Sequence, residues 1–318
     1  MSIQECMTTK VATYIQERRA MGWQLNVEAR ELVRFAAYAD HSGHHGPLTI
    51  DLALRWAREA KSQSRLYQAR RLETVRTFAR FLAIREPGTE IPPRGLLGPA
   101  HQRVRPYIYT ENEIIKLMDE ASRLPSSNGF RALTYRTLIG LLASTGLRIC
   151  EALSLDRRDF DKELGILTIR DTKFHKSRLV PLHESVTSSL VHYESERDNI
   201  IRHPECTRFF ISMRGRPVLP SVVYYTFSKL RNKVVFEGSG RLPPRLYDLR
   251  HTFATRRLLA WYSEKIDVHT KIAQLSVYLG HVKPSDTYWY LTGIPELLSV
   301  AADRFEASCG DLTPGGIS

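Results

Sequence analysis

The sequence predicts a mainly α-helical protein with one small β-hairpin or sheet, an α+β fold arranged in two domains. The chain has 318 residues, which is more than a single hydrophobic core usually serves. Apolar residues recur at three- and four-residue steps over most of its length, and they alternate with polar residues in the segment 166–182. Residues 87–106 carry proline and glycine without any apolar period, which predicts a linker between two separate cores.

The N-terminal segment predicts a helical domain over residues 1–86, made of four helices. Asn26 and Thr49 are good N-caps for helices over 26–40 and 49–62. The next helix, 65–85, has its apolar residues at helical steps: Leu66, Ala69, Leu72, Val75, Ala79 and Leu82. Three arginines lie elsewhere on that helix: Arg70, Arg76 and Arg80.

The second domain is predicted over residues 107–308, followed by a mobile tail over 309–318. Thr110 and Glu113 have the spacing of a capping box, and the apolar helix 131–148 ends near Gly146. The segment 166–182 reads as a hairpin, and 208–218 is expected to add a strand and a turn. The remaining expected helices cover residues 220–234, 246–263 and 294–307.

The composition indicates a soluble, intracellular protein that binds nucleic acid. Lysine and arginine number 46 against 34 acidic residues, a net charge of +12 that suits a polyanionic partner, although a solvated basic surface is the alternative. No apolar run approaches the roughly 18 residues of a membrane span, and no secretory signal is visible. We expect a cytoplasmic, nucleoid-associated protein with no membrane partner. The widely spaced cysteines predict neither a zinc site nor a disulfide framework: Cys6, Cys150, Cys206 and Cys309.

Four short islands place cations, imidazoles or phenols beside turns. "TGLRICEAL" holds Arg148 and Glu151, and the hairpin holds Lys173 beside its turn. "YDLRHTFAT" holds Tyr247 and Arg250, which lie three apart and share a helix face, whereas His251 is rotated away from Arg250. "LGHVKPSDTYWY" gives His281 after a glycine, with Tyr290 nine residues later. Taken singly, each island is more typical of surface charge or packing.

The order and spacing of these islands together resemble the tyrosine recombinase (phage integrase) family. The resemblance runs from about Thr110 to Phe305, and it implies a catalytic domain of that type behind a helical core-binding domain. It implies that Tyr290 is the DNA-cleaving nucleophile, rather than the nearby Tyr288. The other implied active-site residues are the phosphate-binding Arg148 and Arg250, the general acid Lys173 and the phosphate contact His281. Lys176 and Arg178 of the hairpin are expected to contact DNA, as are Arg70, Arg76 and Arg80 of the helix 65–85.

One position departs from the family pattern. The family motif His-x-x-Arg begins here with Tyr247, and a phenol is a poor proton acceptor near neutral pH. The hypothesis is therefore that Tyr247 donates a hydrogen bond to phosphate and that Tyr290 loses its proton to water or to another group. His251 is expected to be structural because its helical angle points elsewhere, and Glu151 is expected to order the active-site arginines or a helix end.

The chemistry explains these residue types. In-line attack on a phosphodiester builds negative charge on its oxygens, which two permanently charged guanidiniums stabilise. A tyrosine hydroxyl needs neighbouring cations or a base before it attacks readily. A departing 5′ oxygen needs a proton, for which Lys173 is placed. A 3′-phosphotyrosyl link retains the energy of the broken bond, so we expect no cofactor, no ATP and no metal.

The resemblance implies a site-specific recombinase that assembles as a tetramer on two double-stranded DNA sites, with a related recombinase as an optional partner. Integration, excision or transposition of a mobile element is the preferred role, and chromosome-dimer resolution is another role that uses the same chemistry. The alternatives are a type IB topoisomerase, or a DNA-binding protein whose catalytic set has decayed. The helix 294–307 is expected to dock on a neighbouring subunit, the other reading being packing on its own domain.

Overall fold

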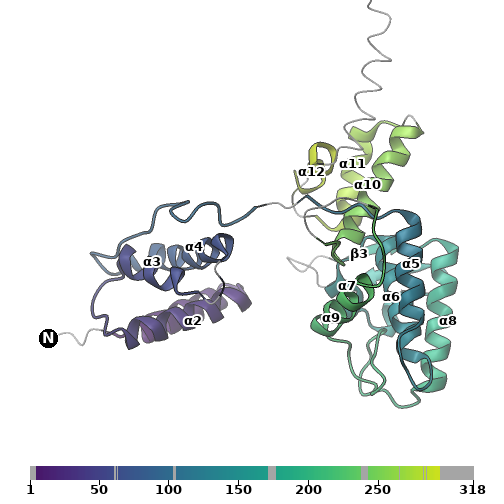
Figure 1. Cartoon of the computed structure of the whole chain (residues 1–318), viewed down its shortest axis with the longest axis horizontal. Helices are drawn as coiled ribbons and strands as arrows, with labels where there is room; N and C mark the ends of the chain where they lie inside the picture. Colours follow the sequence, from purple (N-terminus) through teal and green to yellow (C-terminus); the bar gives the residue numbers. More distant parts are fainter. Residues whose placement is uncertain are drawn as a thin grey trace, which may run out of the picture. The chain divides into compact units, whose positions relative to one another are not determined.

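The chain forms two compact units, Met1–Val104 and Arg105–Ser318, in a computed structural model. The structure describes residues 5–60, 62, 64–102, 105–170, 177–237, 243–264, 266–281, 283 and 285–293. Over these residues the chain is mainly helical with one small antiparallel sheet, which confirms the predicted fold class (Figure 1). In the described part of the chain, no helix combines the length and the apolar character that spanning a membrane requires.

The first unit contains four helices within its described residues, as predicted. They are α1 (Met7–Ala20), α2 (Asn26–His41), α3 (Ile50–Arg58) and α4 (Arg65–Leu82). Thr49 caps α3, its side chain accepting a hydrogen bond from the backbone amide of Leu52. The predicted cap Asn26 is wrong, because Leu25 precedes α2 in the left-handed conformation with φ 46° and Asn26 is already helical. Buried apolar residues of all four helices form one core.

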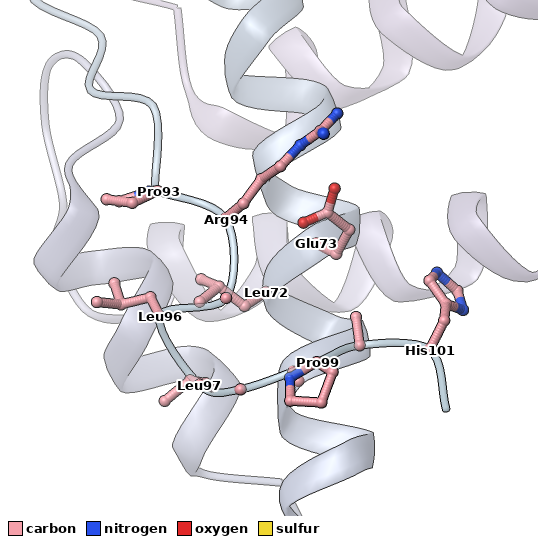
Figure 2. Close-up of a pocket in the computed structure, with 12 residues that line it drawn as sticks. Leu72, Glu73, Pro93, Arg94, Leu96, Leu97, Pro99 and His101 are labelled. Atoms are coloured by element: carbon pink, nitrogen blue, oxygen red, sulfur yellow. The ribbon is translucent and has the colours of Figure 1, made fainter. Parts of the chain in front are cut away.

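Part of the predicted linker lies against α4 instead of running free. Residues 93–101 fold back beside Leu72 and Glu73 and enclose a cavity of about 300 Å³ (Figure 2). Arg70 fixes this segment by donating from Nε to the carbonyl of Ala100 at 3.1 Å. Left-handed glycines at 95 and 98 give the segment its turns. The first compact unit accordingly extends to residue 104.

The second unit is built on α5 (Glu111–Ser122), α6 (Phe130–Thr145) and α8 (Glu184–Ile200), which lie side by side (Figure 1). The capping box at the start of α5 is confirmed: Thr110 accepts from the amide of Glu113, whose carboxylate accepts from the amide of Thr110. As expected from its apolar sequence, α6 is buried on most sides. Two further helices pack against these: α7 (Ile149–Ser154) contacts α6, and α9 (Pro220–Arg231) contacts α5 and α7.

A three-stranded antiparallel sheet provides the predicted hairpin. Its strands are β1 (Phe160–Asp161), β2 (Ile166–Ile169) and β3 (Arg178–Pro181), in the order β1-β2-β3, and β1 follows a 3₁₀ turn, η1 (Arg157–Asp159). The added strand is therefore β1, and the segment 208–218 makes only isolated bridges in the described structure. Leu167 and Val180 pair across the hairpin and are both fully buried, which fixes the register.

The last helices form a small core of their own. They are α10 (Asp248–Ser263), α11 (Val268–Leu279) and α12 (Ser285–Gly293). Leu258 of α10, Leu275 of α11 and Tyr290 of α12 share one buried cluster, and α10 also packs against α6. This arrangement brings the islands of α10 and α12 to the turn between α6 and α7. The predicted helix 294–307 and tail 309–318 lie outside the described residues.

Candidate active site

The turn between α6 and α7 positions the first arginine. Gly146 ends α6 with φ +63°, and a Cβ there would lie 2.7 Å from the Phe253 ring, so only glycine fits. Arg148 follows at the start of α7. Both its backbone amide and its Nη1 donate to the carboxylate of Glu151, at 2.9 and 2.8 Å. Glu151 therefore orders Arg148, in agreement with its expected supporting role.

Glu151 also holds Arg178 of β3, whose Nη2 and Nη1 donate to it at 2.9 and 3.2 Å. The Nε of Arg178 donates to the carbonyl of Tyr278 at 2.7 Å. Burial alone would raise the pKa of Glu151, but the hydrogen bonds and charges of Arg178 and Arg148 hold it below its usual value. The prediction that Arg178 contacts DNA is corrected, because its buried guanidinium is occupied by Glu151 and a backbone carbonyl.

Both predicted phosphate-binding arginines donate hydrogen bonds to carbonyls at the C-terminal end of α11. Arg250 is 1% exposed, and it donates to the carbonyls of Gly146 at 2.7 Å and Leu279 at 2.6 Å. Arg148 donates to the carbonyl of Gly280 at 3.2 Å. Carbonyls at a helix end lack partners within the helix, and cations complement the negative end of its dipole. Both guanidiniums are thereby fixed beside the segment that leads to α12.

One donor of Arg250 lacks a hydrogen-bond partner among the described residues. This donor is Nε, which is buried. Buried donors are normally satisfied, so a donor left open at the meeting point of three chain segments is suited to a substrate oxygen. Burial lowers the pKa of Arg250, as does the neighbouring charge of Arg148, and two cations held this close favour an anion between them.

His281 follows the left-handed Gly280, where a Cβ would lie 2.7 Å from Nη1 of Arg178. The Nδ1 of His281 lies 2.6 Å from the hydroxyl of Thr287, a contact that sets the orientation of the imidazole. Burial lowers the pKa of His281 to about 4, helped by the charges of Arg250 and Arg148. At neutral pH the ring is therefore uncharged and acts as a hydrogen-bonding group.

Tyr290 reaches the same place from α12. It is 2% exposed and stacks against the His281 ring, whereas Tyr288 is 43% exposed. Burial raises the pKa of Tyr290 to about 12, in opposition to the lowering effect of Arg250 and Arg148. The cations expected to lower this pKa are present, but the loss of water around the phenol outweighs them in the DNA-free chain.

His251 is the main difference between prediction and structure. Its Nδ1 lies 3.0 Å from the hydroxyl of Tyr290, so it does not point away from the site as predicted. Tyr247 packs edge-on against the same imidazole, with ring centroids 5.0 Å apart, and is 40% exposed. Tyr247 and His251 are four residues apart and therefore adjacent on α10. The four-residue spacing of Tyr247 and His251 was the sequence signal that could have placed them together.

The other predicted site residues belong to the first unit or fall outside the described chain. Lys173 and Lys176 are among the residues that the structure does not describe. In the first unit, Arg70 and Arg80 are exposed, and Arg76 is half-buried with Nη1 3.5 Å from a carboxylate oxygen of Glu73. Their contact with DNA stays a prediction.

A family model described as "Phage integrase family" matches residues 108–293 of this chain, the part that contains every member of the cluster. The chain belongs to the phage integrase family. The Sinorhizobium fredii protein named integrase/recombinase y4rB is 39% identical over 95% of this chain and 98% of its own. Tyrosine recombinase XerD of Staphylococcus saprophyticus is 30% identical over 60% of this chain and 62% of its own. Among solved structures, the Tn1549 transposon integrase in complex with transposon right end DNA has the same fold, with a TM-score of 0.67 and 16% identity, over 94% of this chain and 99% of that one.

This integrase-family chain is expected to lose stability in mild acid. Burial lowers the pKa values of His251 and His281 from 6.5 to about 4. Between these values the unfolded chain binds more protons than the folded chain, so the free energy of unfolding decreases as the pH falls from 6.5 toward 4. We expect each histidine to contribute on the order of 2 kcal/mol to this decrease.

Urea denaturation at several pH values measures the free energy of unfolding. Carboxylates titrate in the same pH range and contribute a background to its pH dependence. The comparison is therefore between wild type and His281→Asn, which removes one of the two histidines. The variant should show a shallower loss of stability between pH 6.5 and pH 4. Identical pH dependence in both proteins would show that His281 is not buried in its neutral form.

Proposed function

We propose that this chain is a site-specific tyrosine recombinase that cleaves and rejoins duplex DNA through a 3′-phosphotyrosyl intermediate. The observation that carries the proposal is the convergence of Arg148, Arg250, His281 and Tyr290, from four separate parts of the chain, on the C-terminal end of α11. One phosphate group is the anion that this set of donors and a single nucleophile suits best. Membership of the phage integrase family supports the same reaction class.

In the proposed reaction the two guanidiniums and the neutral His281 hold the non-bridging oxygens of the scissile phosphate. These donors are fixed before substrate arrives, since Glu151 and backbone carbonyls already orient the arginines. Such preorganised donors stabilise the charge that develops during in-line attack. The exposed Tyr247 lies beside them and is proposed to donate a further hydrogen bond to phosphate.

Lys173 is proposed to protonate the departing 5′ oxygen, on the strength of its place in the sequence beside the hairpin turn. The ester formed by Tyr290 retains the energy of the original phosphodiester. A second 5′ hydroxyl can therefore attack it and reseal the strand without ATP.

Complete exchange between two duplexes requires four strand cleavages, and each chain carries one such nucleophile. We therefore propose a tetramer on two double-stranded sites, with the arginines of α4 contributing to DNA affinity and with location at the nucleoid. Integration, excision or transposition of a mobile element is the proposed role. It is supported by the relative named integrase/recombinase, which covers nearly the whole chain.

Covalent capture from a library tests this function without knowledge of the target site. Randomised duplexes that carry a nick beside the variable region are incubated with the protein in the presence of a chelator and without nucleotide. DNA that resists denaturing detergent is then sequenced. We expect enrichment of one site, and mass spectrometry of the digested adduct should place the 3′ phosphate on Tyr290. Absence of an adduct, or a link to a 5′ phosphate, would contradict the proposal.

A further inference from the structure

The hydroxyl of Tyr290 meets one nitrogen base in the described structure, the imidazole of His251. The two groups come from α12 and α10, and Nδ1 lies 3.0 Å from the phenolic oxygen. Two more rings hold the imidazole in place: Tyr247 packs edge-on at 5.0 Å and Trp289 edge-on at 5.7 Å between centroids. The contact therefore has hydrogen-bonding distance and a restrained geometry, both of which proton transfer requires.

We propose that His251 is the general base that accepts the proton of Tyr290 as this tyrosine attacks the scissile phosphate. The assignment rests on the proposed cleavage reaction and goes beyond it by naming the proton acceptor. It replaces the hypothesis that water or an unidentified group takes the proton. It also gives a reason why Tyr247 is tolerated at its position, since the base lies one helical turn further along the same face of α10.

The protonation states favour this role. Burial lowers the pKa of His251 to about 4, so at neutral pH the ring is uncharged, and in the Nε2–H tautomer its Nδ1 accepts a hydrogen bond. Burial raises the pKa of Tyr290 to about 12, so the phenol keeps its proton until an acceptor takes it. The charged and titratable groups that face His251 from its own and neighbouring elements are Arg245, Tyr247, Asp248, Arg250, His281 and Tyr290.

The difference between the two pKa values means that the proton moves only as the new bond forms. A bound phosphate adds negative charge next to the imidazole, which raises the proton affinity of His251. The carboxylate of Asp248 acts in the same direction, and Arg245 fixes it through three hydrogen bonds. As the Tyr290 oxygen becomes bonded to phosphorus, its basicity disappears and the proton stays on His251.

The proposed step balances in both directions. In cleavage, a bond forms between the Tyr290 oxygen and phosphorus, the bond from phosphorus to the 5′ oxygen breaks, and the phenolic proton passes to Nδ1 of His251. The departing 5′ oxygen takes a proton from the general acid, proposed as Lys173. In rejoining, the 5′ hydroxyl attacks and returns its proton to that amine. The Tyr290 oxygen then leaves phosphorus and recovers its proton from His251.

The test compares His251→Asn with wild type, because an asparagine amide preserves a hydrogen bond near the position of Nδ1 but cannot take a proton. Single-turnover adduct formation is followed on the captured DNA site and on a copy with a 5′-bridging sulfur. The thiolate leaving group of that copy needs no general acid, so the measurement isolates the nucleophile side. We expect His251→Asn to react about 10²-fold or more slowly on both substrates, at unchanged DNA affinity.

A pH series separates a base from a merely positioning residue. Hydroxide should replace the missing base, so the His251→Asn rate should rise by about tenfold per pH unit, whereas the wild-type rate stays level above the pKa of its base. His192→Asn, on the exposed face of α8, is the matched histidine control and should keep the wild-type rate and pH profile. Wild type should also lose activity on the sulfur substrate as acid protonates His251, a readout that needs no variant.

Two outcomes overturn the assignment: cleavage by His251→Asn at the wild-type rate, or a wild-type pH profile in that variant. Either result would leave strand cleavage by Tyr290 in place, because wild type would still form the adduct. Failure of wild type itself to form any adduct would instead reject the proposed function. The two failures are therefore distinguishable in one experiment.

Discussion

Tyr290→Phe is expected to abolish covalent capture of DNA while leaving DNA binding intact. The substitution removes one oxygen, the only atom of this residue that can bond to phosphorus, and keeps the ring that packs in the cluster of α10, α11 and α12. Without that oxygen no phosphotyrosyl ester can form at position 290. Denaturing gels of protein incubated with the captured site should show the adduct for wild type and none for the variant.

Tyr288→Phe is the matched control, because it removes the same phenolic oxygen two residues before Tyr290. The Tyr288 side chain is 43% exposed. The Tyr288→Phe variant should form the adduct at close to the wild-type rate. An adduct that survives Tyr290→Phe and disappears in Tyr288→Phe would reverse the assignment. Melting temperatures of both variants should stay near wild type, although Tyr290→Phe also loses its contact with His251.

Arg250→Ala is expected to reduce the rate of cleavage by about 10³-fold, near the upper range for removal of one preorganised donor. The guanidinium links the carbonyls of Gly146 and Leu279, and its remaining buried Nε is the donor proposed for phosphate. Truncation therefore removes a substrate contact and leaves two buried carbonyls without their partner. Single-turnover cleavage and a urea denaturation curve measure the two consequences separately.

Arg250→Lys distinguishes charge from geometry at this position. An ammonium keeps the positive charge but lacks the planar fork that reaches two carbonyls and a phosphate together. We expect Arg250→Lys to cleave at a rate between those of wild type and Arg250→Ala. Its rate should also depend less than that of wild type on the identity of the phosphate oxygens. Wild-type cleavage by Arg250→Ala would show that Arg250 is a purely structural cation.

The helices were predictable because each depends on short-range information. Helical apolar periods and the caps at Thr49 and Thr110 depend on residues within a few positions of each other, and the structure confirms these features. The error at Asn26 is equally local, since a left-handed Leu25 is a conformation that β-branched and bulky residues rarely adopt and that sequence patterns do not reveal. The absence of a strand over 208–218 depends instead on pairing with distant residues.

Arg178 was predicted to contact DNA because it is a cation, but it forms a buried ion pair with Glu151. It pairs with Ile169 across the hairpin, and Ile169 is 2% exposed, so both side chains lie on the inner face of the sheet. Arg178 lies two residues before the buried Val180 on β3, so strand alternation places both side chains on the same face. The identity of its partner did not follow, because Glu151 lies 27 positions earlier and meets Arg178 only after α7 and β3 pack together.

The sequence by itself determined the helical α+β class, the basic charge and the family resemblance, with Arg148, Arg250, His281 and Tyr290 as candidates. These features depend on composition, on periodicity and on the spacing of residues within short segments. The tertiary structure alone decided that Glu151 holds Arg178 as well as Arg148, that the C-terminal end of α11 gathers the cations, and that His251 faces Tyr290. The last contact joins residues 39 positions apart. Its geometry depends on how α10 and α12 pack, which no local pattern specifies.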